Sequence, residues 1–200
     1  MPQSDRAELA RSLWNGAVAI EGSPAATYLI EARGLSKSLP ATLRYLPARG
    51  VHPHAMIAAF GYVAESSPGM LAAPGYVPAV HLTRLTPDGR KRLDKRMIGH
   101  VSGHPLVLAP PNDGLGLAIA EGIEDALSIH EATGLGAWAG GSAGHMAKLC
   151  PVVPDWIDCV TLIQDDDVAG RKACARLSSE LFARGFEVRN VCVGGGGHGA

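Results

Sequence analysis

The chain has 200 residues, of which 46% are hydrophobic and 18% charged, and its formal net charge is −1 at pH 7. A chain of this length can bury roughly 70% of the surface that its unfolded form exposes, so this composition excludes a disordered protein and predicts one large domain or two small ones. No apolar run reaches the roughly 20 residues of a membrane span, and the start MPQSDRAELARSLW lacks the apolar centre of a signal peptide, so we expect a cytoplasmic protein without a membrane partner.

Charge is distributed unevenly along the chain. Residues 1–110 contain 12 Lys and Arg against 7 Asp and Glu, a balance of +5, whereas residues 111–200 contain 6 against 12, a balance of −6. This asymmetry favours an anionic partner for the first half and a cationic one for the second. The turn-forming segment APPNDG at 109–114 indicates a boundary, so we expect an α+β subdomain at 1–110, an α/β domain at 111–193 and a flexible Gly-rich tail at 194–200.

The first half contains a helix and a hairpin. PAATYLIEARGL predicts a helix that begins at Pro24 and ends at Gly34. VPAVHLTRLTPDGRKRLDKRMIGH predicts a β-hairpin, with alternation in AVHLTRL, the turn TPDG and a basic returning strand. The hairpin carries enough cations to bind several phosphates with a salt-sensitive affinity, namely Arg84, Arg90, Lys91, Arg92, Lys95 and Arg96. The alternative is a solvated hairpin whose charges prevent aggregation through its edge.

The second half alternates strands with helices. Apolar runs at 115–120, 135–140, 157–164 and 186–193 predict four strands, and the segments 122–134, 142–150 and 168–185 predict the helices between them. Ser142 is the expected cap of the second helix. Short connections between strands and helices imply a mainly parallel sheet with right-handed crossovers. The four cysteines show no CxxC spacing, so we expect buried free thiols rather than ligands or disulfides.

Carboxylates follow two of the predicted strands. Glu121 comes directly after the first strand, in AIAEGIEDAL, and three aspartates come directly after the third, in LIQDDDVAG. Ligands collect at the carboxyl ends of parallel strands, so these acids would converge if the two strands are neighbours. Strand alternation turns Asp165 and Asp167 toward one side and Asp166 toward the other. Such hard oxygen ligands favour Mg²⁺ or Mn²⁺ over zinc.

Three further residues belong to this candidate site. Asp125, one helical turn after Glu121, is either an additional metal ligand or a partner of the helix dipole. Gly122 and Gly170 allow the backbone to approach closely at the two strand ends. The alternative for all the acids is that they only cap helices, which is what Asp and Glu in a first turn commonly do.

AIAEGIEDAL followed by LIQDDDVAGRKA resembles the TOPRIM domain of bacterial-type primases, type IA and II topoisomerases and some nucleases, which is marked by Glu-Gly after one strand and Asp-x-Asp after another. The resemblance covers about residues 114–193. It implies a Rossmann-like fold in which Glu121, Asp165 and Asp167 form an acidic metal triad, with Glu121 also moving a proton in nucleotidyl transfer.

ATYLIEARGL and LRYLP further resemble the start of the bacterial primase catalytic core, as in the primase-like TOPRIM proteins of plasmids and phages. In such cores the basic stretch faces template or nucleotide, and we include Arg171 of the motif DxDxxGR in that role. The resemblance implies a Mg²⁺-dependent primase-like nucleotidyltransferase that uses single-stranded DNA and nucleoside triphosphates in plasmid or phage DNA replication, with a helicase or other replication proteins as partners. A TOPRIM nuclease, in which the triad activates water, and a noncatalytic nucleic-acid-binding module of a replication assembly are the alternatives.

Overall fold

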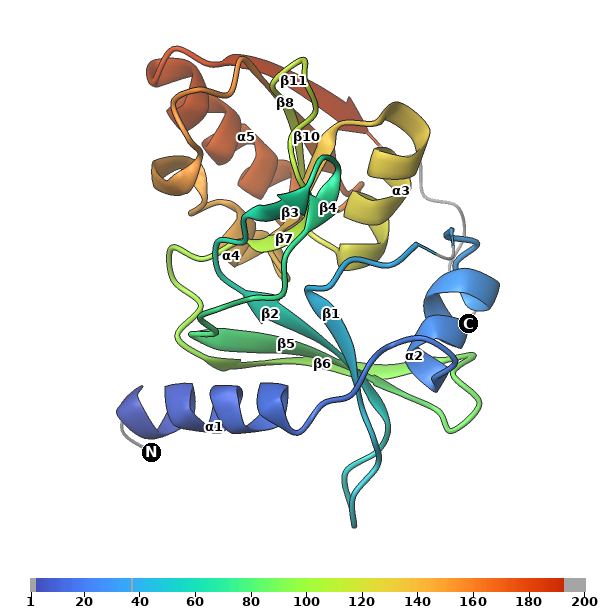
Figure 1. The fold of residues 1–200 in the computed structure, drawn as a ribbon. Coiled ribbons are helices and arrows are strands. Elements are labelled where there is room, and N and C mark those ends of the chain that lie inside the picture. Colours follow the sequence, from blue (N-terminus) through green and yellow to red (C-terminus); the bar gives the residue numbers. More distant parts are fainter. Residues whose placement is uncertain (1–2, 37, 193–200) are drawn as a thin grey trace. The chain divides into compact units, whose positions relative to one another are not determined.

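The computed structural model describes residues 3–36 and 38–192 (Figure 1). The chain divides into two compact units, Met1–Val107 and Leu108–Ala200, close to the boundary expected at 109–114. The predicted Gly-rich tail at 194–200 and residue 193 of the predicted α/β domain lie outside the described residues. Every helix among the described residues is too short or too polar to span a bilayer.

An antiparallel four-stranded sheet forms the centre of the first unit. Its order is β1-β2-β5-β6, with β1 at Leu43–Leu46, β2 at Ala55–Phe60, β5 at Ala79–Leu85 and β6 at Arg92–Gly99. The predicted basic hairpin is confirmed as β5 and β6. A separate two-stranded sheet pairs β3, Glu65–Ser67, with β4, Met70–Leu71. Strands β1 to β4 were not expected from the sequence.

Helix α1, Gln3–Asn15, packs on this sheet and was also not expected. Its residues Ala10 and Trp14 are four apart and therefore lie on the same helix face. Both are buried in a cluster with Ile57 of β2 and with Val80 and Leu82 of β5. This apolar face fixes α1 on the sheet, since burial of large side chains is the main favourable contribution to packing.

The predicted helix after Pro24 exists but changes its winding. It begins as α2, Pro24–Thr27, and continues as the π-helical turn η1, Tyr28–Ala32. Ser23 caps it by accepting hydrogen bonds from the backbone of Ala25 at 3.2 Å and of Ala26 at 3.3 Å. The hairpin turn lies against its first residue: Gly89 has a φ of +71°, and a Cβ there would lie 2.2 Å from the carbonyl oxygen of Pro24.

The second unit is the mainly parallel α/β domain that the sequence predicts. Its sheet has the order β11-β10-β8-β9-β7, and β8 is parallel to both β9 and β10, as β10 is to β11. The strands are β7 at Leu106–Ala109, which spans the division between the two units, β8 at Gly116–Ala120, β9 at Gly136–Ala139, β10 at Cys159–Gln164 and β11 at Glu187–Cys192. The helices are α3 at Ile123–Thr133, α4 at Ala143–Met146 and α5 at Val168–Ala183, with a short 3₁₀ turn η2 at Cys150–Val152.

The chain order of this sheet reverses at β8. From β8 the chain passes through α3 to β9 on one side, and then returns through α4 to β10 on the other side of β8. Helix α3 accordingly covers one face, whereas α4 and α5 lie on the opposite face (Figure 1). Ligands of such sheets bind at the carboxyl ends of the two strands where the chain order reverses, which here are β8 and β10.

Candidate functional site

Two predicted site residues lie at the carboxyl ends of adjacent strands. The parallel ladder between β8 and β10 runs from Gly116 opposite Cys159 to Ile119 opposite Leu162. Glu121 follows this ladder by two residues and Asp165 by three, so both lie at the carboxyl ends of these two strands. The condition on which the sequence argument depended, that these two strands are neighbours, is therefore met.

The pKa of the Cys174 thiol depends on the charge of both carboxylates. Cys174 lies on α5 and is buried, with its Sγ 3.8 Å from the carbonyl oxygen of Ile163 at the end of β10. The pKa of this thiol is raised to about 11, mainly by burial and then, in decreasing order, by negative charge on Asp165, Cys192 and Glu121. Because one thiol experiences the charge of both carboxylates, Glu121 and Asp165 act on the same small region of the domain.

Two glycines hold the first turns of α3 and α5 close to the strand ends. A Cβ at Gly170 would lie 2.9 Å from the Cβ and the carbonyl oxygen of Asp165, and 3.3 Å from Oδ1 of Asp167. A Cβ at Gly122 would lie 2.6 Å from Oδ2 of Asp125. The Asp125 side chain therefore folds back toward the backbone of Gly122, which follows Glu121 directly after β8. A larger residue at Gly122 would displace the Asp125 carboxylate, and one at Gly170 would press on the Cβ and backbone of Asp165.

The remaining aspartates have different partners. Asp167 is the N-cap of α5, and its Oδ1 accepts a hydrogen bond from the backbone of Gly170 at 2.6 Å. Asp166 points outward, with its side chain 72% exposed and its Oδ1 bonded to Nη1 of Arg171 at 2.7 Å. Helix capping, the alternative explanation of the acidic cluster, thus applies to Asp167 rather than to Asp166.

The carboxylates are not assembled into a ligand set. Within residues 3–36 and 38–192, no group of three or more His, Cys, Asp and Glu side chains is placed to hold a metal ion. The donor chemistry of Glu121, Asp125, Asp165 and Asp167 nevertheless fits a hard divalent cation, because all four supply carboxylate oxygens. The assignment of these residues to a metal stays a prediction that needs side-chain rotation at the strand ends.

Acidic partners already hold some of the hairpin cations. Arg84 forms a bidentate ion pair with Asp94, in which Nε donates to Oδ1 at 2.6 Å and Nη2 donates to Oδ2. These two hydrogen bonds lower the pKa of Asp94. Arg96 lies 3.9 Å from the same carboxylate, and Arg90 lies 3.4 Å from Glu31. The sequence analysis treated these cations as equivalent and missed their acidic partners.

The other cations of the hairpin differ in accessibility. Lys91 and Lys95 are exposed and form no ion pair with the described residues, whereas Arg92 is half-buried. Lys95 lies directly opposite Thr83 in the β5–β6 ladder, so its Cβ projects from the sheet face that does not carry α1. These two lysines are the hairpin charges with the greatest freedom to meet a phosphate.

Comparison with known families divides the chain in the same place as its fold. A family described as a domain of unknown function, DUF7146, matches residues 4–108, and the Toprim domain matches residues 116–196. No curated protein matches the chain.

Solved primase structures share the fold. The primase fragment of the bacteriophage T7 primase-helicase protein aligns with a TM-score of 0.56 and 19% identity, over 88% of this chain and 69% of that one. The DnaG catalytic core aligns with a TM-score of 0.54, and a DNA primase domain from Pseudomonas aeruginosa with 0.51. Each of these two is 16% identical and covers 98% of this chain and 72% of its own.

These matches agree with the observed architecture, in which an antiparallel subdomain precedes a parallel α/β domain. The chain belongs to the DUF7146 family, its second half matches the Toprim domain, and its fold is that of solved primase structures.

Proposed function

We propose that this protein is a Mg²⁺-dependent primase-like nucleotidyltransferase, with Glu121, Asp165 and Asp167 as its acidic site. The observation that supports the proposal is the position of Glu121 and Asp165 at the carboxyl ends of adjacent parallel strands, where the chain order of the sheet reverses. The Toprim match and the primase folds of similar structures add to this support. A setting in DNA replication, with a helicase as partner, is proposed because one similar structure comes from a primase-helicase protein.

The proposed roles follow from the chemistry of the side chains. A bound Mg²⁺ or Mn²⁺ would neutralise the charge on the reacting phosphates and orient them. Asp165, Asp167 and Glu121 would hold it, with Asp125 as a further ligand or a partner that orients them. Glu121 would in addition accept the proton of the attacking 3′-hydroxyl.

The basic hairpin would hold the template strand or the triphosphate. Among the cations of the hairpin, Lys91 and Lys95 are exposed and have no acidic partner in the described part of the chain. They would therefore contribute most to binding. Arg171 would reach a phosphate only by releasing Asp166, to which it is bonded at 2.7 Å. Arg84 would mainly stabilise the hairpin through Asp94.

Primer synthesis on single-stranded DNA with labelled nucleoside triphosphates and Mg²⁺ or Mn²⁺ tests the proposal. We expect Asp165→Asn to reduce product about 100-fold or more, the usual loss when a group that stabilises transition-state charge is removed. Asp167→Ser should behave similarly, although serine keeps an oxygen that can cap α5. The matched control is Asp166→Asn, which removes one neighbouring charge from an exposed side chain but keeps an oxygen that can accept from Arg171, so activity should be nearly unchanged.

Three other results would contradict the proposal. Equal loss in all three variants would indicate a general effect of charge on binding. Metal-dependent shortening of labelled nucleic acid instead of extension would assign the same carboxylates to hydrolysis. Unchanged biological activity in a folded Asp165→Asn, Asp167→Ser double variant would indicate a noncatalytic binding module.

A further inference from the structure

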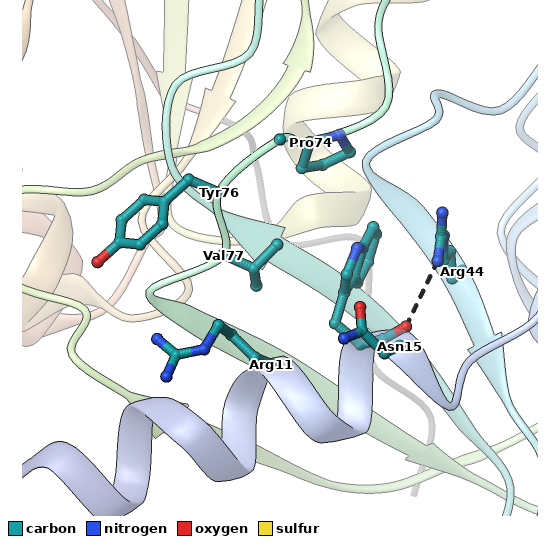
Figure 2. A pocket seen from close by; sticks show the side chains of 8 residues that line it. Arg11, Asn15, Arg44, Pro74, Tyr76 and Val77 are labelled. Atoms are coloured by element: carbon teal, nitrogen blue, oxygen red, sulfur yellow. Dashed lines mark hydrogen bonds between the residues drawn. The ribbon is translucent and has the colours of Figure 1, made fainter.

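A cavity of about 280 Å³ lies in the first unit and shares no residue with the carboxylates of the second unit or with the basic hairpin. It lies between α1, β1 and the loop that leads into β5, and its walls include Arg11, Trp14, Arg44, Pro74, Tyr76 and Val77 (Figure 2). Its volume is just below the ~300–1,000 Å³ of small-molecule sites, so it admits one or two side chains of a partner rather than a large ligand.

Two arginines supply positive charge to this cavity. Figure 2 shows Arg11 and Arg44 on different sides of it. Neither guanidinium has a carboxylate partner among the described residues. Arg44 is oriented by the indole of Trp14, since its Cζ lies 4.5 Å from the ring centroid and its Nη1 lies 3.4 Å from the backbone oxygen of Trp14. A planar guanidinium held in place is suited to bidentate recognition of a carboxylate.

The floor of the cavity is apolar. Trp14 and Val77 are only 4% and 5% exposed, and the half-buried Pro74 adds a further apolar wall. Tyr76 is 62% exposed and stands beside Val77 at the rim (Figure 2). A ligand that fills this site therefore has an apolar group for the floor and negative charge for the arginines.

We propose that this cavity binds an acidic peptide segment of a partner protein, with one apolar side chain on the floor and carboxylates on Arg11 and Arg44. Two observations favour a peptide over a nucleic-acid strand. The guanidinium of Arg44 already covers a face of the Trp14 ring, which limits the surface on which a base could stack. Glu8 lies one helical turn before Arg11 on α1, so the positive surface does not continue along the helix as a track for successive phosphates.

Fluorescence anisotropy with the whole chain tests the proposal. The probe is a labelled peptide Gly-Ser-Asp-Leu-Asp-Gly, compared with Gly-Ser-Asn-Leu-Asn-Gly and Gly-Ser-Asp-Ser-Asp-Gly. We expect only the first to bind well, and Arg11→Gln to weaken its binding about five-fold, as for the loss of one exposed ion pair. Arg44→Lys should also weaken it, because lysine keeps the charge but lacks the planar fork. Arg6→Gln is the matched control: it removes the same charge from an exposed position of α1 that does not line the cavity.

Several outcomes of these binding experiments would overturn the proposal. Absence of binding by the acidic peptide, equal binding of all three peptides, or equal effects of Arg6→Gln and Arg11→Gln would overturn the proposal. A labelled strand of ten thymidines that binds, weakens with Arg11→Gln and is not displaced by the peptide would assign the cavity to nucleic acid instead. The Asp165→Asn variant should bind the peptide normally. Peptide binding therefore tests this inference independently of primer synthesis, which tests the proposed catalytic function.

Discussion

Gly170→Ala is expected to destabilise the protein although alanine is the better helix former. Gly170 is the third residue of α5, and the added Cβ would lie 2.9 Å from two atoms of Asp165, one of them in the backbone. Overpacking of this kind costs about 1–3 kcal/mol, whereas replacing a helical glycine by alanine contributes up to about 1 kcal/mol in the opposite direction. The balance is a net loss on the order of 1 kcal/mol, or about 2–4 °C in Tm for a chain of this size.

Thermal unfolding followed by circular dichroism measures this effect, and Gly144→Ala provides the control. Gly144 is also near the start of a helix. Apart from its two chain neighbours and the backbone of its own helix, no atom lies within 4 Å of the position that its Cβ would take. We expect Gly144→Ala to raise Tm by about 1–4 °C through the reduced entropy of the unfolded chain. If both variants raised Tm equally, the close packing of α5 against Asp165 would be refuted.

Two further predictions concern titrating groups. Reaction of the Cys174 thiol with iodoacetamide near pH 8, measured by mass spectrometry without added metal, should be very slow, because a thiol with a pKa of about 11 is then about 0.1% thiolate. Asp165→Asn should lower this pKa and speed the reaction, and Asp166→Asn serves as the control. An unchanged rate in Asp165→Asn would contradict the position of Asp165 near this thiol. The Arg84–Asp94 pair should stabilise the fold above the ordinary aspartate pKa of 3.8 and lose this contribution as the pH falls through the lowered pKa of Asp94. Urea unfolding of wild type and Asp94→Asn should therefore differ at about pH 6 and converge at about pH 2, and a constant difference would refute the role of this ionisation.

The second unit was predictable from sequence because its signals are local. Each buried strand is a short apolar run, and the helices carry recognisable ends. Gly134 ends α3 in the left-handed conformation with a φ of 70°, and the Ser142 side chain accepts from the backbone of His145 at the start of α4. Short strands between such signals leave few alternative topologies.

The first unit was less predictable because its signals depend on tertiary contacts. All six residues of β2 are buried, so the strand shows no alternation of polar and apolar residues. The helical character of α1 depends on a few apolar contacts with the sheet, and the π-helical winding of η1 has no sequence signature in the segment PAATYLIEARGL. In the second unit, the expectation of buried free thiols is confirmed for Cys150 and Cys174 but wrong for Cys192, which is exposed, and Cys159 is only half-buried.

The sequence located the candidate site but could not assign the roles of its side chains. Strand ends placed Glu121 and Asp165 at one edge, since this requires only the order of the strands. The hydrogen bond from Gly170 to Asp167 depends on how α5 begins, and the ion pair of Arg84 with Asp94 depends on the register of the hairpin. Such details follow from three-dimensional geometry rather than from residue spacing.

The contact between the hairpin turn and the start of α2 has a consequence for affinity. Gly89 lies against Pro24, and Arg90 is paired with Glu31 of η1, so the tip of the hairpin is anchored at two points within the first unit. A long loop that carries lysines loses conformational entropy when it becomes ordered around phosphates, and this loss weakens binding. Anchoring of the tip is already complete before any phosphate arrives, so Lys91 is presented from a preorganised backbone.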